Sequence, residues 1–127
     1  MLNKHDLEDY KAMGWTQPEG TKYDHDKPPI SFVDSEYIEG VARVLGFGAS
    51  KYSPHNWRNG INFSRLISAA YRHLGAINKG EDVDAETGEL HAYHLACCTM
   101  FLSALTLHRP DLDDRYKLPS SSLKETK

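Results

Sequence analysis

Two pairs of side chains in this sequence stand at spacings that suit a divalent cation. Glu36 and Glu39 lie three residues apart, so on a helix their carboxylates project to the same side and can share a hard cation. The helix dipole alone also favours glutamates in a first turn, so this pair has a purely structural interpretation too. His91 and His94 have the same spacing, which places two imidazole rings on one helix face as metal ligands or acid and base groups.

An acidic segment, GEDVDAETG, comes directly before the two histidines. It resembles a calcium-binding loop only superficially, because Thr87 stands where that loop requires glycine and Tyr93 where it requires a bidentate glutamate. The segment can line a metal site and cap the following helix, or it can be a solvated acidic turn. Its Glu81-x-x-Asp84 spacing competes with His91-x-x-His94 for the second half of a metal site.

Residues 51–60, KYSPHNWRNG, gather aromatic and cationic side chains between the turn signals Ser53-Pro54 and Asn59-Gly60. Surface loops of this content often carry binding residues. The sequence has no G-x-x-x-x-G-K-[ST] loop and no G-x-G-x-x-G segment after a strand. Phosphate groups would therefore have to be bound by metal ions together with lysine and arginine.

Three principal helices have to position these residues, and a shorter one is expected near the N-terminus. Asp34 or Ser35 can cap the first principal helix, Gly80 ends the second, and Pro110 ends the third. No alternating strand pattern of useful length occurs, so the predicted fold class is all-α. The expected helices cover residues 3–13, 35–51, 63–79 and 89–107.

The last of these helices is apolar almost all round from Leu95 to Leu107, which is more apolar circumference than two neighbouring helices can cover. We therefore expect the helical bundle to be completed by oligomerisation, as a homodimer or homotetramer.

The 127 residues have the length of one domain, with an expected core over about 22–110 and a tail over 111–127. A net charge of -3 argues against a protein that holds nucleic acid by neutralising many phosphates. The adjacent Cys97 and Cys98 are expected to be buried, reduced thiols, and no stretch is apolar enough for a leader or a membrane span. The expectation is a cytoplasmic protein, in the host cytoplasm if a phage encodes it.

Several segments in order carry a family resemblance. They are KYDHDKPP, then E-x-x-E followed by VARVLGFGASKY, then NWRNG, then RHLGAINKGEDVDAETGELHAYH. Together they resemble the MazG-like dATP/dGTP diphosphohydrolases of phages and bacteria, including the MazZ-type enzymes, over roughly Lys22 to Leu107. The resemblance implies an all-α nucleotide pyrophosphohydrolase that binds Mg²⁺ or Mn²⁺ and splits a purine deoxynucleoside triphosphate into monophosphate and pyrophosphate.

The family pattern pairs an E-x-x-E on one helix with an E-x-x-D on a later helix, where this sequence has His91-x-x-His94. We therefore favour a composite site. Glu36 and Glu39 match the E-x-x-E half of the family pattern, and Asp84, His91 and His94 complete the metal ligands or the shell that activates water. Histidine ligands would shift the preference of the site from Mg²⁺ toward Mn²⁺ or another ion that accepts imidazole ligands. Tyr52 or Trp57 would stack on the base and Asn56 would pair with a purine edge, while the phosphates would be neutralised by Lys51, Arg58 and Arg72.

Two other interpretations remain open. His5-Asp6 and His25-Asp26 suggest an HD-type metal enzyme that releases tripolyphosphate, although the chain is short for that fold. A helical metal-binding or interaction module without catalysis is the third. Trp57 also has two interpretations, as a base-stacking residue or as a core anchor.

Overall fold

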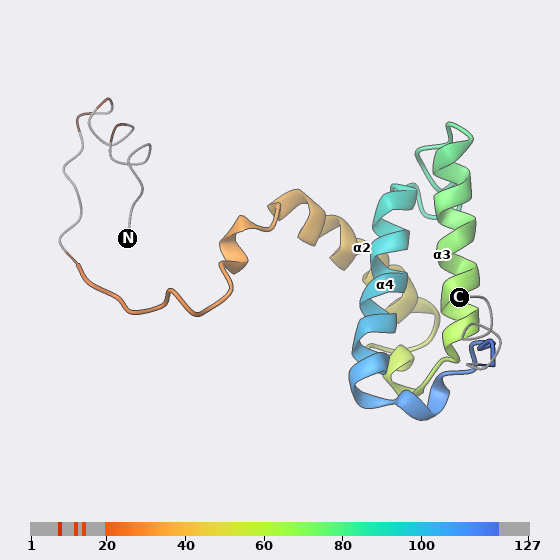
Figure 1. The fold of residues 1–127 in the computed structure, drawn as a ribbon. Helices are drawn as coiled ribbons and strands as arrows, with labels where there is room; N and C mark the ends of the chain where they lie inside the picture. Colours follow the sequence, from red (N-terminus) through yellow and green to blue (C-terminus); the bar gives the residue numbers. More distant parts are fainter. Residues whose placement is uncertain (1–7, 9–11, 13, 15–19, 120–127) are drawn as a thin grey trace, which may run out of the picture. The chain divides into compact units, whose positions relative to one another are not determined.

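The computed structural model describes Glu8, Ala12, Gly14 and residues 20–119 of the chain (Figure 1). The chain divides into two compact units, residues 1–30 and residues 31–127, and the prediction of a single domain stays a prediction. Most of the predicted helix over residues 3–13 lies outside the described residues, and Glu8 and Ala12, the two described within it, are helical. Residues 120–127 of the predicted tail also lie outside them.

Three α-helices form the second unit: α2 (Ser35–Lys51), α3 (Phe63–Asn78) and α4 (His91–His108). Short 3-10 turns are present at Ile30–Phe32, Asn56–Asn59 and Pro110–Leu112. The described residues contain one isolated β-bridge, between Val83 and Leu90, and no strand. The predicted all-α fold class is confirmed.

Local chemistry explains the ends of these helices. α2 begins where predicted, because the Asp34 carboxylate accepts a hydrogen bond from the backbone N–H of Tyr37 at 3.0 Å. Gly80 follows α3 with a φ of 91°, a left-handed conformation that glycine adopts without strain. α4 begins at His91, two residues later than predicted, because the bridge between Val83 and Leu90 holds the preceding residues in an extended turn.

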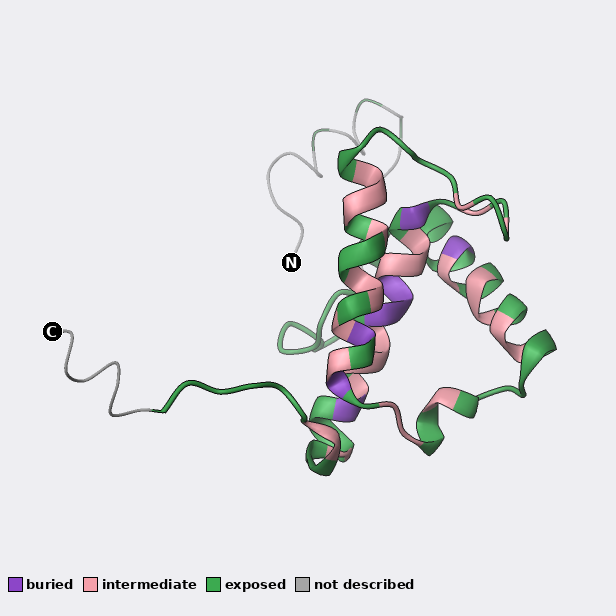
Figure 2. Cartoon of the chain, turned by 90° about the vertical axis from the view of Figure 1, so that its right-hand side faces the viewer, coloured by how far each residue is buried: buried purple, intermediate pink, exposed green. Residues whose placement is uncertain are grey.

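Helices α3 and α4 lie side by side and enclose the core (Figure 1). Phe63, Leu66 and Leu105 form its buried centre, and Trp57 and Phe101 pack against them. Helix α2 contacts α4 at Gly40, where a Cβ atom would overlap the Tyr93 ring. Figure 2 shows that most positions of α2 stay exposed or half-buried, and Gly40 is its one buried residue.

A single chain leaves part of the apolar circumference of α4 uncovered. Cys97 and Cys98 are buried as predicted, but Leu107 near the end of the helix is 77% exposed. None of the described helices has the length and apolar character needed to cross a membrane.

Candidate metal centre

One group of potential metal ligands comes together in the described part of the chain. It consists of His73 from α3, Asp84 from the acidic segment and His91 from the first turn of α4, and their ligand atoms lie within 4.8 Å of one another. The Nδ1 atoms of His73 and His91 are 2.9 Å apart. Asp84 and His91 were predicted as ligands from the sequence, whereas His73 was not.

The donor set fits a divalent transition-metal ion. Two ligands at right angles around an ion with bonds of about 2.1 Å lie about 3 Å apart, close to the separation of the two Nδ1 atoms. Two imidazoles and one carboxylate favour Mn²⁺ or a similar ion over Mg²⁺, which prefers oxygen ligands.

The surroundings of His73 and Asp84 favour the charge states in which these side chains bind a cation. Burial of the imidazole, reinforced by the neighbouring His94 and His91, lowers the pKa of His73 and so favours the neutral ring with a free lone pair. Burial opposes ionisation of Asp84, but hydrogen bonds from the backbone N–H groups of Thr87 and Glu86, together with electrostatic interaction with His94, outweigh it, and the pKa of Asp84 lies below its usual value.

The turn of the acidic segment orients Asp84. Its Oδ1 atom accepts hydrogen bonds from the backbone N–H groups of Glu86 at 2.9 Å and Thr87 at 3.1 Å. All recorded hydrogen bonds of this carboxylate go to Oδ1, so Oδ2 remains for a cation. The turn closes through further backbone hydrogen bonds from Asp84 to the Glu89 carbonyl and from Gly88 to the Asp84 carbonyl.

Glu81 orients the second histidine. His91 is buried, and its Nε2 atom lies 3.1 Å from the Glu81 carboxylate. A carboxylate on one ring nitrogen fixes the proton there and leaves the other nitrogen, Nδ1, as the lone pair that faces His73. Neither of the two competing pairs is in the ligand group as a whole. Asp84 of Glu81-x-x-Asp84 and His91 of His91-x-x-His94 are in it, whereas Glu81 and His94 are not.

His94 lies beside the ligand group without being part of it. Its ring stacks on that of His73, with centroids 4.7 Å apart and planes inclined by 12°. Its Nε2 atom is 2.8 Å from the Thr87 hydroxyl. This arrangement suits a residue that positions His73; as a direct metal ligand, His94 stays a prediction.

Helix α2 contributes charges near the acidic segment. Lys51, predicted to bind phosphate, pairs with Glu86, and this hydrogen bond raises the pKa of Lys51. Arg43 donates to Glu89 at 2.7 Å. Glu36 and Glu39 are exposed near the start of α2 and are not in the ligand group of this chain, so their role as ligands stays a prediction.

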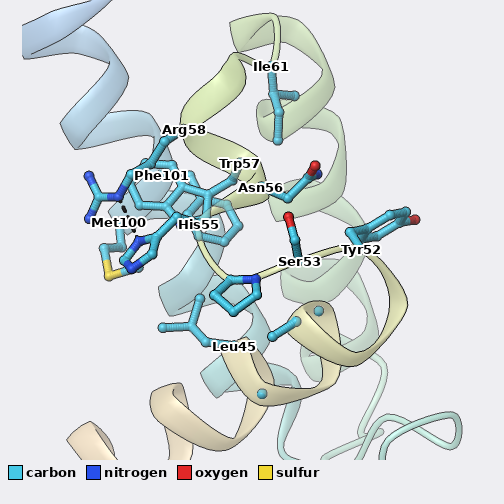
Figure 3. Close-up of a pocket in the computed structure, with 14 residues that line it drawn as sticks. Leu45, Tyr52, Ser53, His55, Asn56, Trp57, Arg58, Ile61, Met100 and Phe101 are labelled. Carbon is cyan, nitrogen blue, oxygen red and sulfur yellow. Dashed lines mark hydrogen bonds between the residues drawn. The ribbon is translucent and has the colours of Figure 1, made fainter.

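A cavity of about 560 Å³ lies beside the loop that follows α2. Figure 3 shows this cavity between the end of α2, the loop and the middle of α4, where Met100 and Phe101 line it. Most of its lining is apolar, which suits a planar base. Four of the predicted substrate-binding residues line it: Tyr52, Asn56, Trp57 and Arg58.

Two of these four residues are already engaged. The Trp57 ring stacks on Phe101 with centroids 4.7 Å apart, and the Arg58 guanidinium lies 4.3 Å from the Trp57 ring centroid. The Nε atom of Arg58 also donates to Nδ1 of His55 at 2.9 Å, as Figure 3 shows. These contacts support the interpretation of Trp57 as a core anchor. Tyr52 is 72% exposed and is therefore the aromatic ring that a base can reach.

The family model described as dATP/dGTP diphosphohydrolase, N-terminal, matches residues 17–115. The chain belongs to this family. A curated dATP/dGTP diphosphohydrolase of Salmonella phage PMBT28 is 44% identical over 96 residues, which are 76% of this chain and 33% of that relative. The chain thus spans about a third of the length of the curated relative. No solved structure matches the chain.

The stretch matched by the family model contains the whole ligand group and the apolar cavity. Sequence reasoning missed His73, because a single histidine on a helix has no spacing signal. It also missed two neighbouring side chains that orient histidines. The Glu81 carboxylate lies within hydrogen-bond distance of His91, and the Thr87 hydroxyl lies within hydrogen-bond distance of His94.

Proposed function

We propose that this chain hydrolyses dATP or dGTP to the monophosphate and pyrophosphate with the help of a divalent cation. Membership of the dATP/dGTP diphosphohydrolase family supports the substrate class. The observation that carries the proposal is the ligand group of His73, Asp84 and His91.

These three residues would hold the ion, with Mn²⁺ preferred over Mg²⁺ because two donors are imidazoles. When bound, such an ion polarises phosphate oxygens and lowers the pKa of an attacking water. Glu81 keeps the Nδ1 lone pair of His91 directed at His73, and His94 holds the plane of the His73 ring. Lys51, which already pairs with a carboxylate of the acidic segment, can exchange that partner for a phosphate.

The apolar cavity would hold the base. His94 and Phe101 are seven residues apart on α4, which corresponds to about 10 Å along the axis and to the same helix face. One nucleotide can span that distance, with its phosphates at the histidines and its base against Tyr52 and Asn56. Trp57 and Arg58 would shape the wall of the cavity rather than contact the phosphates.

Glu36 and Glu39 are proposed as further carboxylate donors on the strength of the family resemblance. A partner subunit can supply the pair, since Glu36 and Glu39 are exposed and outside the ligand group of this chain. Glu36→Gln and Glu39→Gln should each abolish turnover and leave the circular dichroism spectrum unchanged. Full activity of either variant in excess metal would exclude that residue from the site.

Incubation with a panel of deoxynucleoside triphosphates and Mn²⁺ tests the reaction class. The proposed chemistry releases pyrophosphate from dATP or dGTP. Release of tripolyphosphate would indicate an HD-type enzyme instead, and the absence of turnover with every nucleotide would indicate a module without catalysis.

A further inference from the structure

A second cavity, of about 410 Å³, lies along one face of α3. We call it the arginine groove and define it by Arg65, Ser68 and Arg72, which all line it. Their spacing of three and four residues places them in one row on the helix. The two guanidinium-bearing residues are two turns apart, which is about 10 Å along the axis.

The two arginines of the groove differ from the other arginines of the described chain. Arg43, Arg109 and Arg115 each bind a carboxylate, and Arg58 binds His55 and covers Trp57. Within residues 20–119, no hydrogen bond or ion pair is recorded for the side chains of Arg65 and Arg72, and both are exposed. Two arginines that pair with none of the described residues thus share one groove in a chain whose net charge is -3.

The neighbouring polar groups narrow down where an anion can lie. Ser64, at one end of the groove, donates its hydroxyl and backbone N–H to Asp114 at 2.6 and 2.8 Å. Ser64 is therefore unavailable to an anion, and the Asp114 carboxylate repels one from that end. The Ser68 hydroxyl lies between the two arginines and has no recorded hydrogen-bond partner in the described residues, so it can donate to an anion.

We infer that the arginine groove binds a pyrophosphate-type anion. A guanidinium donates two parallel hydrogen bonds to phosphate oxygens, and two guanidiniums along a row suit an anion with linked phosphates better than a single phosphate. The inference rests on the proposed function, in which such an anion is both the tail of the substrate and the released product. Arg72, at one end of the groove, directly precedes the metal ligand His73 on α3, and consecutive helical residues point about 100° apart.

Isothermal titration of the full chain with inorganic pyrophosphate, at low salt and with EDTA present, tests this inference without any metal. We expect Arg65→Gln and Arg72→Gln each to weaken binding by about tenfold or more, the scale of a lost charge-assisted hydrogen bond. Lys79→Gln is the matched control, because Lys79 is exposed, ends the same helix and carries the same charge. It should change the affinity less than about twofold.

Titration of dATP in competition with pyrophosphate distinguishes the two sources of the anion. Competition assigns the groove to the nucleotide tail, and pyrophosphate binding without competition assigns it to the released product. The inference is wrong if pyrophosphate does not bind, or if Lys79→Gln weakens binding as much as Arg65→Gln. The titration contains no metal, so its result is independent of turnover. If pyrophosphate does not bind but the chain still turns over nucleotide, only the inference about the arginine groove is wrong. If pyrophosphate binds but no nucleotide is turned over, only the proposed reaction is wrong.

Discussion

The two Nδ1 atoms of His73 and His91 lie 2.9 Å apart, so both cannot carry a proton there. Without a cation, one ring has to donate to the other. With a cation, both lone pairs can face the ion, and the Glu81 carboxylate on Nε2 of His91 keeps the second proton on the far side of that ring.

Glu81 should therefore matter for metal affinity although it is not in the ligand group. Glu81→Ala is expected to weaken Mn²⁺ binding by about 10 to 100-fold, the usual effect of removing a carboxylate behind a histidine ligand. Asp82→Ala is the control, since it removes the neighbouring carboxylate, whose side chain has no recorded hydrogen bond. Titration calorimetry with Mn²⁺ compares the two, and equal affinities would show that Glu81 has no orienting role.

The sequence predicts those ligand residues that lie close together along the chain. Asp84 and His91 are close to each other along the chain, and their residue types suggested a cation. His73 lies 18 residues from His91 and meets it only because α3 and α4 pack side by side. The engagement of Trp57 by Phe101 and Arg58 is likewise a tertiary contact that no local pattern encodes.

The packing of helix α2 against α4 depends on the close approach of the two helices at Gly40. A side chain at this position would overlap the Tyr93 ring, so Gly40→Ala should lower the free energy of unfolding by about 1 to 3 kcal/mol despite its better helix propensity. Gly46→Ala, in the same helix, meets nothing within 4 Å and should raise it by roughly 0.5 to 1 kcal/mol. Urea denaturation measures both, and equal effects of the two variants would contradict this packing.

Helix positions could be predicted well because their end signals are local. Asp34 caps α2 as expected, and α3 ends one residue before the predicted boundary. The start of α4 was placed too early, since the bridge between Val83 and Leu90 forms only when the acidic segment folds back on itself. How α2 lies against α4 depends on the close approach of Gly40 to the Tyr93 ring, a tertiary contact that no local pattern encodes.

For the molecule as a whole, the buried core is small and apolar side chains remain outside it. On α2, Tyr37, Ile38 and Phe47 are 41 to 50% exposed, and Leu107 of α4 is 77% exposed. This exposure is consistent with the predicted association of copies through α4.

Sedimentation at micromolar concentration should therefore find more than one subunit. Leu107→Glu should shift the chain toward the monomer, because a buried unpaired carboxylate is costly in an interface. Tyr116→Glu changes a side chain that is 84% exposed outside the helices and should leave the assembly intact. A monodisperse monomer of the unmodified chain would refute the prediction.

The most direct measurement of the metal-dependent reaction is the Mn²⁺ affinity and pyrophosphate release of His73→Ala beside His108→Ala. His73 is in the ligand group, whereas His108 is exposed at the end of α4. With dATP and dGTP as substrates, we predict that His73→Ala loses at least about 100-fold in turnover and binds Mn²⁺ at least about tenfold more weakly. His108→Ala should match the unmodified chain in both. Unchanged turnover and Mn²⁺ binding in His73→Ala would contradict the account, because the reaction would then proceed without the ligand group.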